Sequence, residues 1–184
     1  MKKTLVVAIA LIASVTSDAQ QTTTSTPKSE SKFESFSSKS GTIVRFTDFP
    51  TEGLKRKYGK GETSVRKVTN GNNESRYFLK ITNEGQYSTS TAVIEYSDLL
   101  EIIKAIFVLK QSETTDITNP NYTESKFRTS DGFEVGYYVS GGKSNWYIQL
   151  ERIGRDNTIF PSGTISELEQ VFLSAKNKIE ELKK

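Results

Sequence analysis

The stretch STAVIEYSDLLEIIKAIFVLK (residues 90–110) decides the fold, because it predicts the end of a β-strand that runs directly into a helix. One face of this helix is marked by apolar residues at helical spacing: Leu99, Ile102, Ile103, Ile106 and Leu109. Apolar residues also fill much of the opposite face, and a helix that is apolar nearly all round is usually buried. Ser97 is the expected N-cap, and a polar loop is expected from residue 111 onward.

A second strand-to-helix junction lies near the C-terminus, in NTIFPSGTISELEQVFLSAKNK (residues 157–178). Its apolar residues form one narrower stripe: Leu168, Val171, Phe172, Ala175, Ile179 and Leu182. Because β-rich segments precede both helices, the sequence predicts an α+β fold in which an antiparallel sheet carries two helices. The strands-then-helix unit is either duplicated or simply occurs twice, and the pattern leaves both alternatives open.

Three dipeptides predict tight hairpins between the strands. They are Asn70-Gly71, Asp131-Gly132 and Gly141-Gly142, which all suit turns that need a positive φ. The last two would connect three strands between residues 122 and 150, so an antiparallel meander is expected there.

The N-terminus predicts export. A Lys-Lys start precedes an apolar run of about a dozen residues, and Ser17 and Ala19 place small side chains before a cleavage site. We therefore expect a signal peptide at residues 1–19, a disordered Ser/Thr-rich tether at 20–40, and a single α+β domain at 41–184. The alternative is that Phe33 and Phe36 dock onto the domain, so that order begins near them. The predicted location is secreted or periplasmic, and cleavage would lower the formal net charge from +3 to +2.

The composition excludes several kinds of chemistry. The chain has no cysteine, so it has neither a disulfide nor the cysteine that anchors a bacterial lipoprotein. It has no histidine, which removes the commonest general base and every Ser-His or Cys-His catalytic pair. No ligand spacing indicates a metal site, and no motif indicates a cofactor. After the signal peptide, no stretch is long and apolar enough to predict a transmembrane segment.

Two tyrosines are the first candidate ligand site. Strand alternation places Tyr137 and Trp146 on one face of the meander, where we expect core, and Tyr138 and Tyr147 on the other. If both helices pack on the Trp146 side, the tyrosine face is open. Gly136 is expected to leave a gap beside Tyr138, so that a flat ligand could stack there. Ordinary cross-strand pairing is the alternative interpretation.

A basic loop is the second candidate site, with Lys55, Arg56 and Lys57 as the possible phosphate or nucleic-acid contacts. A solvated loop is the alternative, since basic loops are common. A carboxylate pair, Glu134 and Glu151, is the remaining catalytic option, because a glycosidase needs only two such groups.

The order of elements over about residues 42–184 resembles the whirly family of single-stranded DNA-binding proteins, although the lysine-rich strand motif of that family is absent. This resemblance implies a sheet surface that binds an extended polymer. The chain also resembles small secreted proteins of Bacteroidetes-type bacteria, whose signal peptides often end Ala-Gln, as at Ala19-Gln20. That resemblance implies a compartment and no activity.

The sequence thus favours a non-enzymatic binding or interaction domain with a protein or glycan ligand. The alternatives are a domain that binds single-stranded nucleic acid, which the small net charge does not favour, and a hydrolase based on carboxylates.

Overall fold

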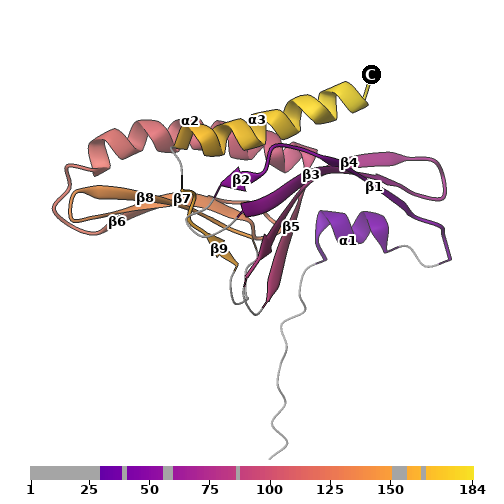
Figure 1. Ribbon diagram of the computed structural model, residues 1–184, viewed down its shortest axis with the longest axis horizontal. Coiled ribbons are helices and arrows are strands. Elements are labelled where there is room, and N and C mark those ends of the chain that lie inside the picture. Colours follow the sequence, from indigo (N-terminus) through magenta and orange to yellow (C-terminus); the bar gives the residue numbers. More distant parts are fainter. Residues whose placement is uncertain (1–29, 39–40, 56–59, 86–87, 151–156, 163–164) are drawn as a thin grey trace, which may run out of the picture.

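The computed structural model describes residues 30–38, 41–55, 60–85, 88–150, 157–162 and 165–184. Within these ranges the chain forms three helices and nine strands, and the strands make two antiparallel sheets (Figure 1). The predicted α+β class is confirmed, but the strands divide between two sheets where one was expected. The predicted signal peptide at residues 1–19 lies outside the described residues and stays a prediction.

The first sheet has five strands: β1 (Arg45–Pro50), β2 (Leu54–Lys55), β3 (Lys60–Thr69), β4 (Ser75–Glu84) and β5 (Thr89–Glu95). Both β1 and β2 pair with β3, which pairs with β4, and β5 follows on the far side of β4. β1 is therefore an edge strand of this sheet.

The second sheet is a meander of β6 (Thr123–Arg128), β7 (Glu134–Ser140), β8 (Lys143–Gln149) and the short β9 (Thr158–Ile159). A long helix follows each sheet: α2 (Tyr96–Asp116) after the first and α3 (Ile165–Leu182) after the second. The expected order of strands, helix, strands, helix is confirmed. It is preceded by one short helix that was not expected, α1 (Lys32–Ser37).

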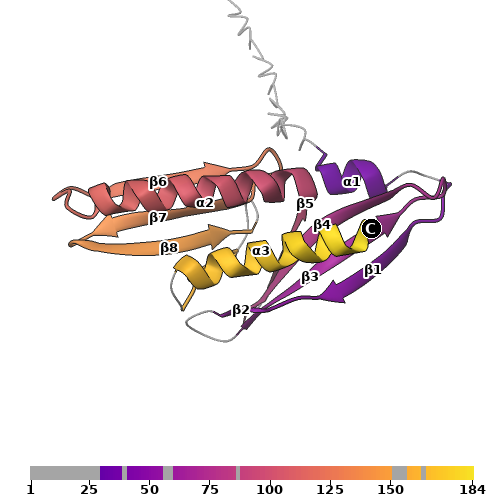
Figure 2. The same cartoon turned by 90° about the horizontal axis from the view of Figure 1, so that it is seen from above.

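The two long helices lie side by side and cover the same side of both sheets (Figures 1 and 2). Lys110 Nζ of α2 donates to Glu169 of α3 at 2.7 Å across their contact. Beneath them is the main core, whose largest fully buried side chains include Leu79, Leu99, Ile102, Tyr137, Ile148 and Phe172. The apolar stripe expected on α3 is buried as predicted, except that Leu182 at its end is half-buried. Because the helices share one side, the opposite face of each sheet is left for other contacts.

α2 differs from the expected helix in three ways. It begins at Tyr96 with Glu95 as N-cap, so Ser97 lies in the first turn and its hydroxyl donates to Glu95. It continues through the polar segment 111–116, which was expected to be a loop, because tertiary contacts hold its last turn. It is also not buried all round, since Phe107 and Val108 are each 58% exposed. The apolar composition of this helix therefore predicted more burial than the structure shows.

Only one of the three predicted tight hairpins is tight. Gly141 and Gly142 form the two-residue turn between β7 and β8, with φ of 59° and 70°. The other two connections each contain five residues, 70–74 and 129–133, so the predicted two-residue turns there are wrong. In the first, the Asn70 side chain accepts hydrogen bonds from the backbone N–H groups of Asn72 and Glu74, which stabilises the longer loop.

The last part of the predicted tether is folded. Ser31 and Glu34 form a capping box at the start of α1, and this helix lies against the side of the first sheet opposite α2 and α3 (Figure 1). Phe36 is buried with Val68 and Phe78, and these three residues form a second, smaller core. In the described part of the chain, the folded domain therefore includes α1 and begins before residue 41.

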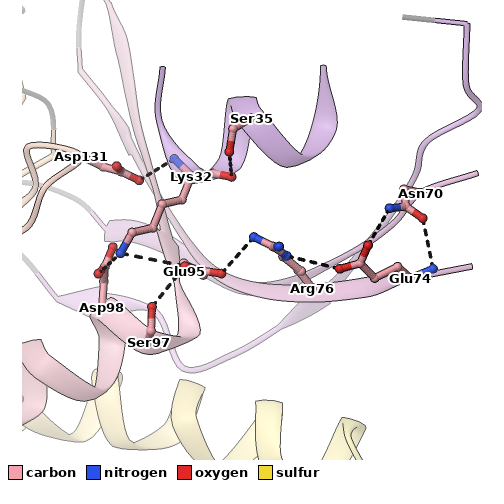
Figure 3. A network of polar contacts seen from close by, with 9 residues as sticks. All are labelled: Lys32, Ser35, Asn70, Glu74, Arg76, Glu95, Ser97, Asp98 and Asp131. Carbon is pink, nitrogen blue, oxygen red and sulfur yellow. Dashed lines mark hydrogen bonds and ion pairs between the residues drawn. The ribbon is translucent and has the colours of Figure 1, made fainter. Parts of the chain in front are cut away.

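A network of polar contacts ties α1 to the rest of the domain (Figure 3). The backbone N–H of Lys32 donates to the carboxylate of Asp131 at 3.0 Å, in the loop between β6 and β7. The Lys32 ammonium pairs with Asp98, which is buried in the first turn of α2, and lies 3.9 Å from Glu95. Arg76 extends the network to Glu95 at 3.5 Å, so the helix is linked to both sheets.

Candidate functional site: the tyrosine face of the second sheet

The side chains of the second sheet point to the two faces that the sequence predicted for them. Tyr137 and Trp146 face the helices, with ring centroids 5.0 Å apart, and the Tyr137 hydroxyl donates to Asp116 of α2 at 2.6 Å. Trp146 is half-buried against the core, which is less burial than expected. Tyr138 and Tyr147 therefore lie on the opposite face, which we call the tyrosine face. None of the three described helices covers it (Figure 1).

Tyr147 is not the exposed stacking residue that the sequence predicted. It is only 7% exposed, and its hydroxyl donates to Glu124 Oε1 of β6 at 2.5 Å. Burial and this hydrogen bond both raise the pKa of Tyr147 above its ordinary value, so the phenol stays neutral and keeps donating. Tyr147 therefore supports the tyrosine face and does not present its ring to solvent.

Glu124 is the acceptor at the centre of the tyrosine face. It receives the Tyr147 hydroxyl and, at 3.0 Å, the Tyr122 hydroxyl, and Lys126 Nζ lies 3.7 Å from it. These contacts, the hydrogen bond from Tyr147 first, hold the pKa of Glu124 below its ordinary value. An ionised Glu124 thus orients two tyrosines from one position.

The exposed aromatic surface consists of Tyr122 and Tyr138. Their rings stack at a centroid distance of 6.1 Å with an interplanar angle of 24°. Tyr122 is 65% exposed, and Tyr138 is half-buried beside it. Tyr122 was missed as a site residue, although alternation along β6 would have placed it on the same face as Glu124. The stacked pair Tyr122–Tyr138 replaces the predicted pair as the candidate site.

Gly136 does not leave the predicted gap. A Cβ atom at this position would lie 2.5 Å from the carbonyl oxygen of Ser125 and 2.6 Å from Cβ of Lys126. Glycine is therefore needed because β6 approaches β7 closely here, not because a ligand enters. Tyr147 lies directly opposite Gly136 in β8.

A buried carboxylate lies farther along the same face. Glu134 is completely buried, and its oxygens pair with Arg128 and, at 3.1 Å, with Lys126. A buried carboxylate that is held by two cations has its charge compensated and is structural in character. Its proposed catalytic partner, Glu151, lies outside the described residues.

The basic loop is only partly described, because Arg56 and Lys57 fall outside the described residues. Lys55 lies in β2, on the first sheet, with Nζ 3.9 Å from Glu167 of α3. Beside it a shallow pocket of about 170 Å³ separates β2 from the first turns of α3. Lys55 and the tyrosine pair thus lie on different sheets, and the structure does not bring the two predicted sites together.

Comparisons with known proteins give no match: the chain matches no protein-family model, no curated protein and no solved structure. Within the described ranges, no group of three acidic, histidine or cysteine side chains is placed to hold a metal ion. No helix in the described part of the chain is both long enough and apolar enough to cross a membrane.

Proposed function

We propose that this protein is an exported, non-enzymatic binding domain whose ligand stacks on the Tyr122–Tyr138 pair. The observation that carries the proposal is an exposed, stacked aromatic pair on a sheet face that none of the described helices covers. Tyrosine rings offer a large apolar contact at a low cost in conformational entropy, and their hydroxyls add a polar handle.

A glycan is the ligand class that this surface suits best. A sugar ring presents an apolar face, which stacks on an aromatic ring, and hydroxyls at its rim, which need polar partners. Here the aromatic pair is flanked by the carboxylate of Glu124 and by Asn145, which lies directly opposite Tyr138 in β8. A few polar groups around an apolar contact give orientation and specificity.

The alternatives have less support. Binding of single-stranded nucleic acid would need basic residues that are free to contact phosphates beside the stacking rings. Lys126 and Arg128 on the tyrosine face are paired with Glu124 and Glu134, and Lys55 lies on the other sheet. A carboxylate hydrolase would need a free acid, whereas Glu134 is paired with two cations.

Binding of the purified protein to an array of immobilised oligosaccharides tests the proposal. Tyr138→Ser should weaken binding at least about tenfold, a loss of roughly 1.4 kcal/mol. Phe107→Ser is the matched control, because it removes an exposed ring from α2 on the helix-covered side. Equal binding by the wild type and Tyr138→Ser would contradict the proposal. Tyr138-dependent binding to single-stranded DNA that falls steeply with salt would support the nucleic-acid alternative instead.

A further inference from the structure

β1 is an edge strand with an exposed apolar side chain, and a second one lies just before it. None of its six residues is buried, and Figure 2 shows it along the outer margin of the first sheet. Phe46 is 48% exposed, and Ile43, two residues before the strand, is 86% exposed. An edge strand presents a row of unpaired backbone N–H and C=O groups, which is a template for pairing with another strand.

The hydrogen-bond pattern shows which backbone groups of β1 face outward. Just beyond the strand, the N–H of Thr51 donates to the carbonyl of Thr63 at 3.1 Å, so residues 45, 47 and 49 direct their backbone groups at β3. Phe46 and Asp48 direct theirs away from β3, at an edge where no other described strand pairs with β1. Pro50 also faces outward, where its missing N–H costs no bond within the sheet.

We infer that two copies of this chain pair through β1, antiparallel and about a two-fold axis at Phe46. The outward backbone groups of residues 46 and 48 would then join the two first sheets into one continuous sheet. In this register Phe46 lies opposite Phe46 of the second copy, and Ile43 lies opposite Phe49. Both exposed apolar side chains of the edge thereby gain apolar partners.

Charge favours this register over its neighbours. An axis at Arg45 would oppose two guanidinium groups directly, and an axis at Thr47 would place Asp48 opposite Phe46. With the axis at Phe46, Arg45 lies opposite Thr47 and no like charges are directly opposed. The Asp48 carboxylate is already neutralised by two hydrogen bonds of 2.7 Å from Arg66, so it does not repel a second strand strongly.

Disulfide trapping tests the register, because the chain has no cysteine of its own. Hydrogen-bonded residues that oppose each other lie about 5.5 Å apart at Cα, inside the range of about 4.4–6.8 Å that a disulfide needs. Under mild oxidation, Phe46→Cys should form a covalent dimer at least about tenfold faster than Phe107→Cys, the control on α2. Equal rates would overturn the inference.

A second pair of variants keeps Phe46 in place, since its ring also contacts Phe33 at 6.1 Å. Arg45→Cys mixed with Thr47→Cys should form a mixed disulfide, while each variant alone should react at the rate of the α2 control. Both positions are exposed, so folding should be unchanged.

Sedimentation equilibrium of the cysteine-free protein provides the independent readout. The wild type should dimerise with concentration, and Phe46→Lys should weaken the dimer at least about tenfold because it opposes two ammonium groups on the axis. Circular dichroism confirms that each variant is folded. A wild type that stays monomeric at every concentration tested, or a dimer that Phe46→Lys leaves unchanged, would overturn the inference.

Discussion

Gly136 shows how a single residue sets the distance between two strands. β6 approaches β7 so closely that a methyl group at Gly136 would overlap the Ser125 carbonyl. The sequence pattern identified this glycine as unusual, but alternation cannot tell a gap from a close approach. Only the paired backbone distinguishes them.

Gly136→Ala should therefore destabilise the domain by about 1–3 kcal/mol, because β6 must shift to admit the new methyl group. Urea unfolding measures this loss. Gly141→Ala is the comparison: that position is open, so only the strain of its positive φ, about 1–2 kcal/mol, opposes the change. A neutral Gly136→Ala would contradict the close approach.

Tyr138 and Tyr147 should respond differently to substitution, although the sequence treated them alike. Tyr147→Phe removes a hydrogen bond to an ionised carboxylate and should cost about 1.5–3 kcal/mol of stability. Tyr138→Ser should cost no more than about 1 kcal/mol, since it loses only cross-strand packing. Thermal or urea unfolding of both variants checks the order. A larger loss for Tyr138→Ser would make that ring core and remove the proposed site.

At the scale of elements, the strands, their faces and the two long helices could be predicted from apolar periodicity. Element ends could not. α2 continues to Asp116 through a polar segment because Asp116 accepts hydrogen bonds from Ser125 of β6 and Tyr137 of β7, which lie outside the helix. The five-residue loop at 129–133 pairs Glu124 with Tyr138, whereas a two-residue turn at Asp131-Gly132 would pair it with Val139. Loop length therefore decided the geometry of the site.

Tyr137→Phe should loosen the last turn of α2. The lost hydrogen bond to Asp116 should cost about 1.5–3 kcal/mol and should speed amide exchange in residues 111–116. If exchange there is unchanged, this contact does not hold the helix end.

Tyr137 should also make the stability of the domain depend on pH. Burial, together with the bond to Asp116, raises the pKa of Tyr137 to about 12 from an ordinary value of 10.0. Because the folded state favours the neutral phenol, this contribution to stability is complete below pH 10 and is lost as the pH rises from about 10 to 12. Urea unfolding over that range should show a steeper alkaline loss for the wild type than for Tyr137→Phe. Parallel curves would contradict the raised pKa.

At the scale of the whole molecule, the order of strands and helices predicted the fold class, but composition did not predict the N-terminal boundary. Residues 30–38 are rich in serine and are assigned to the tether by composition, whereas their two phenylalanines favour the alternative that order begins there. Phe33 and Phe36 do supply the apolar contacts that dock α1 on the first sheet. Low apolar content averaged over a segment hides two well-placed aromatic residues. Composition alone therefore placed the start of the domain too late.

Export is also a whole-molecule prediction. Cleavage after Ala19 should leave Gln20 as the first residue of the mature protein. Intact-mass measurement of the protein from its native host should find this species, and a mature chain that keeps Met1 would contradict export by a cleaved signal peptide.

The most direct test of the account is an NMR titration of the tyrosine ring signals with the oligosaccharide that binds best on the array. The chain has eight tyrosines, and these include Tyr137 on one face of the second sheet and Tyr122 and Tyr138 on the other. One spectrum therefore reports on both faces. The account predicts that the ring signals of Tyr122 and Tyr138 shift together and saturate, while those of Tyr137, on the helix side, stay in place. Shifts confined to other tyrosines, or no shift at Tyr122 and Tyr138, would contradict a ligand site on the tyrosine face.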